Sequence, residues 1–218
     1  MAKLIGPLHS TEARGAVGGL IYNTWRGISY AKSFASPAQP RTERQLAIRA
    51  ITTQVVRAWA SLDDAKRNTW TAYSENHPEI DWTGVPKRIT GANWYLRCNV
   101  RLLDMGKSAI DTAPTTPAPD APTSFACTGG ANQISCAWTS ITGTNATVDL
   151  WLCGPHTNGK MGKIQQAKHN VYAPGETSPK IISDLTPGTY TVFARVIDET
   201  TGLASTWVSD VAEVTEAP

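Results

Sequence analysis

Apolar and polar side chains alternate in two short runs near the start of the chain. The runs cover residues 20–25 and 28–34, and Arg26-Gly27 separates them. Alternation on both sides of an X-Gly pair is typical of a β-hairpin. Pro37 then ends the second strand. Because large residues stand on both faces of this hairpin, we expect both faces to be covered.

The apolar period becomes helical from residue 42 onward. Thr42-Glu43-Arg44-Gln45 is a capping box, which predicts a first helix that begins at Thr42. A second start signal at Ser61 predicts a bend there and a second helix that ends before Pro78. A third helix is predicted to begin at Thr90 and to stop at Gly106, a typical left-handed cap. The hairpin and three helices together predict an α+β domain over residues 1–108.

The period returns to alternation over residues 123–217. Gly, Pro-Gly and Asn-Gly turns separate short runs of β-forming residues. About seven strands at this spacing predict a β-sandwich over residues 123–218, and so a multidomain α+β chain. The predicted strands are Ser124–Thr128, Gln133–Thr139, Thr147–Leu152, Lys163–Ala167, Lys180–Asp184, Tyr190–Ile197 and Ala212–Thr215.

Residues 109–122 contain four prolines and divide the chain by charge. The part that ends at Ile110 has 15 Lys and Arg against 8 Asp and Glu, whereas the part after it has 5 against 10. Proline-rich segments act as semi-rigid, extended spacers. We therefore expect a Pro-rich linker at 109–122 that holds an acidic sandwich away from a basic domain.

A motif late in the chain carries a family resemblance. Leu185-Thr-Pro-Gly-Thr-Tyr190, which follows a strand with Trp138, resembles a fibronectin type III domain. The resemblance implies that Leu185 closes the sheet and that Tyr190 forms the corner at the start of the next-to-last strand. The adhesive tripeptide of that family is absent, so the resemblance implies no integrin binding.

The front half resembles uncharacterised structural proteins of tailed phages and prophages. The resemblance rests on the Gly-rich opening with its hairpin, on Pro40-Arg41-Thr42, on Leu62 through Trp70, and on Thr90-Gly-Ala-Asn93-Trp94. It implies a virion structural component and supplies no active site.

Basic and aromatic side chains in the front half are the candidate recognition surface. Such residues are typical of protein interfaces, of nucleic-acid sites through phosphate pairing and base stacking, and of solvated helix faces over core tryptophans. These three interpretations stay open. The candidate interface residues are Trp25, Arg26, Arg41, Arg44, Arg67, Arg88, Arg97 and Arg101.

No residue pattern indicates catalysis or metal binding. The Gly-rich segment 15–19 lacks the Lys-Ser/Thr ending of a phosphate loop, and the acids Asp63-Asp64 suit the first turn of a helix. The four histidines and four cysteines have no zinc-ligand spacing. We therefore expect no enzyme activity, cofactor or metal site.

Two of the four cysteines flank a predicted turn. Cys127 and Cys136 have spacing that places them on one side of a hairpin, so a disulfide is one interpretation and two buried thiols are the other. The chain begins without a signal peptide and has no apolar membrane span, which favours synthesis in the cytosol.

Together these features lead to a functional hypothesis. We expect a non-enzymatic virion protein of a tailed phage-like particle, either a capsid decoration or a minor head, neck or tail component. It would dock in multiple copies onto other particle proteins through its basic domain and display the sandwich, without membrane contact. The alternatives are a nucleic-acid-binding protein that uses the basic helices and an adhesive or carbohydrate-binding surface protein.

Overall fold

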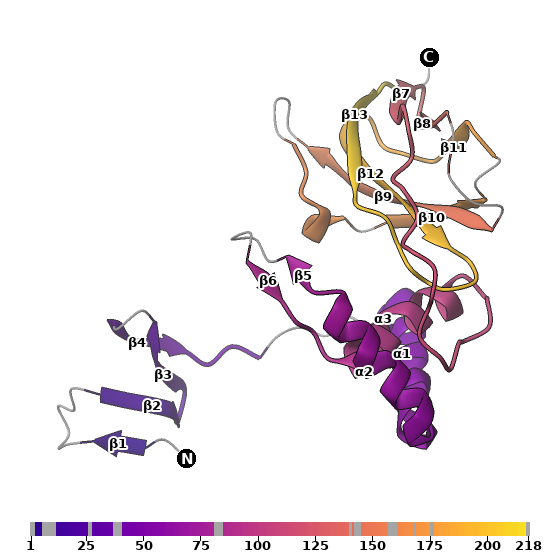
Figure 1. The fold of residues 1–218 in the computed structure, drawn as a ribbon. Helices are drawn as coiled ribbons and strands as arrows, with labels where there is room; N and C mark the ends of the chain where they lie inside the picture. Colours follow the sequence, from indigo (N-terminus) through magenta and orange to yellow (C-terminus); the bar gives the residue numbers. More distant parts are fainter. Residues whose placement is uncertain are drawn as a thin grey trace. The chain divides into compact units, whose positions relative to one another are not determined.

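The computed structural model describes residues 3–5, 12–25, 28–36, 41–80, 85–139, 141, 145–156, 161–167, 169–174 and 177–216. The chain forms two compact units, Met1–Glu43 and Arg44–Pro218 (Figure 1). Three helices and several antiparallel sheets make it a mixed α+β protein.

The first unit is a four-stranded antiparallel sheet. Its strands β1 (Lys3–Ile5), β2 (Glu12–Val17), β3 (Leu20–Trp25) and β4 (Ile28–Ser33) are hydrogen-bonded in sequence order. The predicted hairpin is β3–β4, and β1 and β2 were not predicted. The unit does not cover its own hairpin faces, since none of its described side chains is buried, and the expectation that both faces are covered stays a prediction.

Three helices open the second unit: α1 (Glu43–Ser61), α2 (Asp64–Asn76) and α3 (Gly91–Asp104). Two short strands, β5 (Glu79–Ile80) and β6 (Pro86–Lys87), pair between α2 and α3.

The start of α2 differs from its prediction. Asp63 is the N-cap, and its Oδ1 accepts a hydrogen bond from the Lys66 backbone N–H at 2.8 Å. Ser61 does not cap α2, because its hydroxyl instead donates to the Ala58 carbonyl at 2.8 Å and so belongs to the end of α1. An N-cap side chain accepts a hydrogen bond from the backbone N–H two or three residues further along the chain, and Asp63 makes that bond.

Both predicted ends of α3 are confirmed. Thr90 is the N-cap and its hydroxyl accepts from the Asn93 backbone N–H. Gly106 follows the helix with φ +74°, the left-handed conformation that ends many helices. Gly91 lies against α2, since a Cβ there would stand 2.7 Å from the Trp70 carbonyl carbon.

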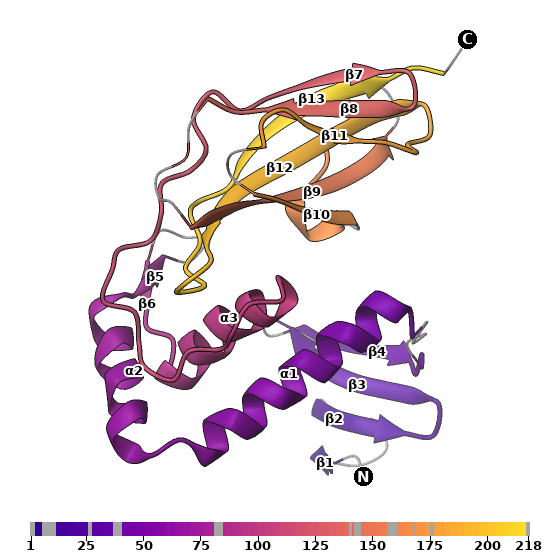
Figure 2. The same ribbon diagram turned by 90° about the vertical axis from the view of Figure 1, so that its right-hand side faces the viewer.

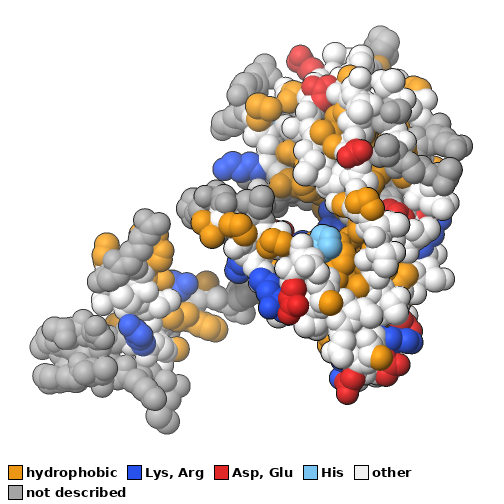
Figure 3. Space-filling model, in the orientation of Figure 1, with side chains coloured by type: hydrophobic (Ala, Val, Ile, Leu, Met, Phe, Trp, Pro, Cys, Tyr) orange, Lys and Arg blue, Asp and Glu red, His pale blue; other side chains and the backbone are white. Residues whose placement is uncertain are grey.

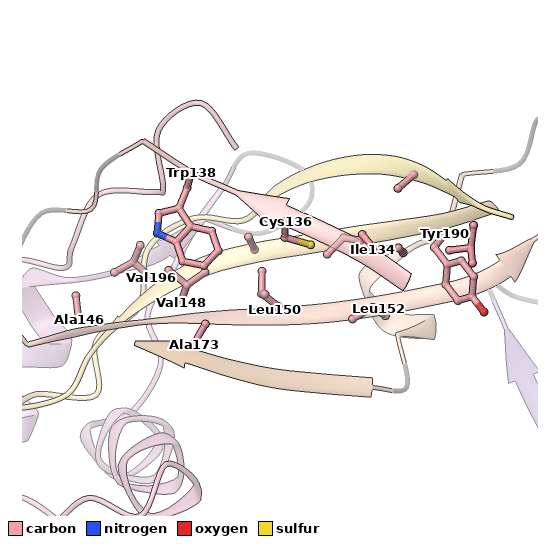
Figure 4. Close-up of a cluster of buried hydrophobic side chains, with 14 residues drawn as sticks. Ile134, Cys136, Trp138, Ala146, Val148, Leu150, Leu152, Ala173, Tyr190 and Val196 are labelled. Carbon is pink, nitrogen blue, oxygen red and sulfur yellow. The ribbon is translucent and has the colours of Figure 1, made fainter. Parts of the chain in front are cut away.

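The remaining strands form two antiparallel sheets with a common core. The three-stranded sheet has the order β11 (Lys180–Ile182), β8 (Gln133–Ala137), β7 (Ala126–Gly130). The four-stranded sheet has the order β10 (His169–Pro174), β9 (Ala146–His156), β12 (Gly188–Asp198), β13 (Val208–Val214). Buried side chains of both sheets, among them Trp138, Leu150 and Tyr190, fill the space between them (Figure 4).

In the sandwich, one predicted strand is wrong and one observed strand was missed. Residues 163–167 contain the short 3-10 helix η1 (Ile164–Gln166), and β10 pairs with β9 in register with Tyr172 opposite Asp149. Val171 and Tyr172 are β-forming residue types, whereas Ile164 is the only such residue in 163–167. The other six predicted strands are present with shifted ends.

The Pro-rich segment 109–122 contains no helix or strand, but its first residues are bound to the helices. The Asn99 side chain donates to the Ile110 carbonyl at 3.1 Å and accepts from the Ile110 N–H at 2.7 Å. The buried Trp70 indole donates to the Asp111 carbonyl at 2.8 Å. The expectation of an extended spacer that holds two bodies apart is therefore wrong for this part of the segment.

The loop between β12 and β13 brings the sandwich to the helices. Leu203, 2% exposed, belongs to the same apolar cluster as Val55, Trp70 and Cys98. Figure 2 shows this yellow loop beside α3. Residues 44–218 thus form one compact unit, and independent folding of 1–108 and 123–218 stays a prediction.

Candidate interaction surfaces

The predicted interface residues do not form one continuous surface. Trp25 and Arg41 belong to the first unit, and both are exposed. Arg26 lies outside the described residues. The other five belong to the second unit and are distributed over α1, α2, α3 and the residue that follows β6.

Acids of the same chain pair with four of these five arginines. Such pairs lower the net charge that the helices present to a polyanion. The nitrogen–oxygen distances are 2.5 Å for Arg44–Asp104, 3.5 Å for Arg67–Asp64, 3.0 Å for Arg88–Glu75 and 3.0 Å for Arg97–Glu79.

Arg44 joins α1 to α3 and to the sandwich. Its two terminal nitrogens donate to the two Asp104 oxygens, and the Tyr172 hydroxyl of β10 donates to Asp104 Oδ2. Hydrogen bonding to Asp104 raises the pKa of Arg44, and burial raises the pKa of Tyr172. Arg44 is therefore a structural contact in this unit.

Arg101 of α3 also lies where the helices meet the sandwich. It donates to the Gly202 carbonyl at 3.1 Å, and burial followed by the positive charge of Arg195 lowers its pKa to about 10. Arg195 bonds the fully buried Asp149 through Nε at 2.9 Å and Nη2 at 2.7 Å. Burial raises the pKa of Asp149, and the charge of Arg195 opposes that shift.

We call this group the seam cluster: Arg44, Arg101, Asp104, Asp149, Tyr172 and Arg195. The sequence analysis missed the sandwich members: Tyr172 lies on β10, which was not predicted, and no local signal pairs Asp149 or Arg195 of the predicted strands with residues so far away. Most of its charged groups form ion pairs or hydrogen bonds with one another. The cluster is therefore a structural contact between the helices and the sheet.

One face of α1 is exposed. Leu46 and Val56 on α1 are about half exposed, at 49% and 53%. A shallow hollow of about 470 Å³ is lined by Arg49, Ala50, Thr53, Gln54 and Arg57 of the same helix. Only Val55 is buried on α1, so most of the surface of this 19-residue helix is open to contact.

The sheet of the first unit carries several large apolar side chains that are exposed. Ile28, Tyr30 and Phe34 alternate along one face of β4 and its extension, with exposed fractions of 65%, 39% and 62%. Trp25 stands opposite Ile28 on that face and is 61% exposed. Figure 3 shows hydrophobic side chains on the surface of this sheet. We call Trp25, Ile28, Tyr30 and Phe34 the apolar face.

The described residues show no group of three or more His, Cys, Asp or Glu side chains that could hold a metal ion. In the same part of the chain, no helix combines the length and apolar character that a bilayer span requires.

No protein-family model and no curated protein matches this sequence. Solved structures do resemble it in part. FN3tt is 14% identical, with a TM-score of 0.37, over 47% of this chain and 100% of its own length. The chicken CNTN1 FN1-FN3 domains are 14% identical, with a TM-score of 0.34, over 46% of this chain and 35% of their own length.

A family 76 glycoside hydrolase from a bovine Bacteroides thetaiotaomicron strain is also among these structures. It is 14% identical, with a TM-score of 0.32, over 43% of this chain and 20% of its own length. The expectation that this chain is not an enzyme is corrected on this finding, because an enzyme chain stands among its structural neighbours. Since the match spans a fifth of the hydrolase, it establishes no enzymatic family.

Proposed function

We propose that this protein is a structural component of a tailed phage-like particle. It docks onto another particle protein through the apolar face of its N-terminal sheet and displays the β-sandwich. The observation that carries the proposal is that apolar face. Four large, exposed apolar side chains stand on one face of a sheet in which no described side chain is buried.

A sheet of this kind gains little stability by itself. A sheet that is hydrophobic on one face must bury that face against another element to be stable. Contiguous exposed apolar patches mark protein contacts in soluble proteins. In this proposal the missing layer is supplied by a partner.

The partner's chemistry follows from the charges around the apolar face. Residues 1–43 have five Lys and Arg against two Glu, and Arg14 and Lys32 are exposed on the sheet. Lys32 stands on the apolar face between Tyr30 and Phe34, so a protein surface that combines apolar and acidic side chains complements this arrangement. We commit to a different particle protein as the occupant, with a second copy of this chain as one outcome of the test.

We further propose that residues 123–218 are a fibronectin type III domain. The arrangement of three and four strands supports this, as does the corner at Tyr190, whose hydroxyl donates to the Thr186 carbonyl at 2.9 Å. Leu185 packs against the sandwich core beside it. The sandwich is the displayed part of the protein in this proposal.

Changing the apolar face tests the docking role. The double variant Ile28→Ser and Phe34→Ser removes two anchors without touching the second unit, and we expect incorporation into particles to fall at least tenfold. Hot-spot anchors of this size are worth about 2 kcal/mol or more each. Incorporation is measured by quantitative blotting of purified particles, and electron microscopy of the native assembly locates the chain.

Ile181→Ser is the matched control, because Ile181 is 55% exposed on β11 of the second unit. Normal incorporation of the double variant contradicts the docking role. Self-association of the purified chain, lost in the double variant, identifies a second copy as the occupant.

The two alternatives remain predictions. Nucleic-acid binding is weakened as an interpretation by the acids that pair with Arg44, Arg67, Arg88 and Arg97. A carbohydrate site on the sandwich has few exposed aromatic candidates, since the Trp207 ring lies 4.3 Å from the Arg195 guanidinium.

A further inference from the structure

Two thiols of the sandwich face each other across a hairpin. Cys127 on β7 stands directly opposite Cys136 on β8, and their sulfur atoms are 3.2 Å apart. A separation of this size is contact distance without a bond, and both residues are thiols in this structure. The two sulfur atoms that a disulfide would join are therefore already in contact.

The backbone geometry at this position suits a cross-link. The Cys127 N–H donates to Asp210 Oδ2 at 2.7 Å and so is not bonded to Cys136, which makes this a non-hydrogen-bonded pair. Such pairs have Cα atoms about 4.5 Å apart. That value lies inside the range of roughly 4.4–6.8 Å that disulfides span, so no backbone movement is needed.

The two sulfurs differ in access to solvent. Cys136 is fully buried in the sandwich core (Figure 4). Cys127 is partly exposed. A dissolved oxidant therefore reaches Cys127 first, and Cys136 is the resolving thiol. The other two cysteines, Cys98 and Cys153, are both buried.

We propose that Cys127 and Cys136 form a redox lock, a disulfide made when the chain moves from reducing to oxidising surroundings. The oxidant is a small-molecule disulfide such as oxidised glutathione. The Cys127 thiolate attacks it, a mixed disulfide forms and one glutathione thiolate leaves. The Cys136 thiolate then attacks the Cys127 sulfur and displaces the second glutathione. Two thiols are oxidised, one small disulfide is reduced, and two protons are transferred.

The lock fixes the first hairpin of the sandwich. β7 and β8 follow the Pro-rich segment, and β8 joins β11 in the three-stranded sheet. A covalent link across them restricts the unfolded chain and stabilises the sandwich. This inference does not depend on the proposed docking role, because it uses only residues of the sandwich.

The experiment treats the full-length reduced chain with oxidised glutathione at about pH 8.5. An alkaline pH is chosen because the hydrogen bond to Cys136 and burial raise the pKa of Cys127. Remaining thiols are alkylated after unfolding, and the disulfide is then reduced and labelled with a second reagent. We expect the second label on Cys127 and Cys136 alone, found by fragment sequencing of the peptide that contains both.

A stability measurement supplies a second readout. Locking should raise the midpoint of thermal unfolding by roughly 5–10 °C, and a reductant should reverse the shift. The double variant Cys98→Ala and Cys153→Ala keeps the pair and should behave the same way. Cys136→Ala removes the resolving thiol and should stop at a glutathione adduct on Cys127.

Two results overturn the proposal. One is that all four cysteines carry the first label after treatment with the oxidant. The other is that the wild-type chain accumulates glutathione adducts without the internal bond.

Discussion

At the scale of single residues, Glu199 shows how one carboxylate ties the sandwich to the helices. Its Oε2 lies 2.5 Å from the Lys107 ammonium just beyond α3, and the Thr147 hydroxyl donates to its Oε1 at 2.5 Å. The hydrogen bond from Lys107 is the main reason that the pKa of Glu199 lies below its ordinary value of 4.5. The charged form is thus bound more strongly in the folded protein.

This residue predicts part of the acid sensitivity of the protein. Because the pKa is lowered by folding, the stability that Glu199 contributes is complete above about pH 4.5 and is lost as the pH falls through the lower folded-state pKa. Glu199→Gln should therefore lower stability at neutral pH and flatten the fall in stability below pH 4.5. Urea unfolding at a series of pH values measures both effects.

Glu213→Gln on β13 is the matched control, since this glutamate is exposed. Two results would contradict the role assigned to Glu199. One is that the stability of Glu199→Gln falls with pH as steeply as that of the wild type, and the other is that both variants show the same change.

At the scale of elements, the loop between β12 and β13 packs directly against the backbone of α3. Gly202 has φ +71°, and a Cβ there would stand 2.4 Å from the Cys98 carbonyl oxygen. Leu203 beside it is buried among helical side chains. The approach of loop and helix is therefore close enough that only glycine fits at residue 202.

Two glycine variants separate conformation from packing. Gly202→Ala and Gly106→Ala both place a side chain at positive φ, with φ +71° and +74°, but a Cβ at Gly106 meets nothing within 4 Å. We expect Gly106→Ala to cost about 1 kcal/mol, from conformation alone. Gly202→Ala should cost about 2 kcal/mol more, because the loop must move away from α3.

Chemical denaturation gives the free energies of unfolding of both variants. Equal losses of unfolding free energy in the two variants would mean that the loop does not press on α3. The close contact described between Gly202 and Cys98 would then be wrong.

At the scale of the whole molecule, the helices depend on residues far along the chain. Ile110 and Ala113 from the Pro-rich segment and Leu203 from the sandwich all pack against the helical cluster. A helical fragment that ends at residue 108 lacks these contacts, whereas Arg44–Pro218 retains them.

Truncation tests this dependence. A chain of residues 44–218 should unfold cooperatively at nearly the same temperature as the full protein, and a fragment of residues 1–108 should show no cooperative transition. Circular dichroism during heating measures both. Cooperative unfolding of the 1–108 fragment would instead support the domain boundary that the sequence predicted.

Local signals predicted most of the elements. The capping residue Thr90 and the left-handed Gly106 bound α3 as expected, and alternation located six of the seven predicted strands. The candidate surface was less predictable. Arg44 and Arg101 look like free surface cations in sequence, yet Asp104 and the Gly202 carbonyl accept their hydrogen bonds.

The sequence by itself determined where the three helices and most of the sandwich strands form, because caps, turns and apolar period act over a few neighbouring residues. Only the tertiary structure decided which side chains remain exposed, because a partner such as Asp104, 60 residues away from Arg44, is brought near by packing. For the same reason, alternation placed Ile28 and Phe34 on a strand, but only the arrangement of the sheet left them uncovered.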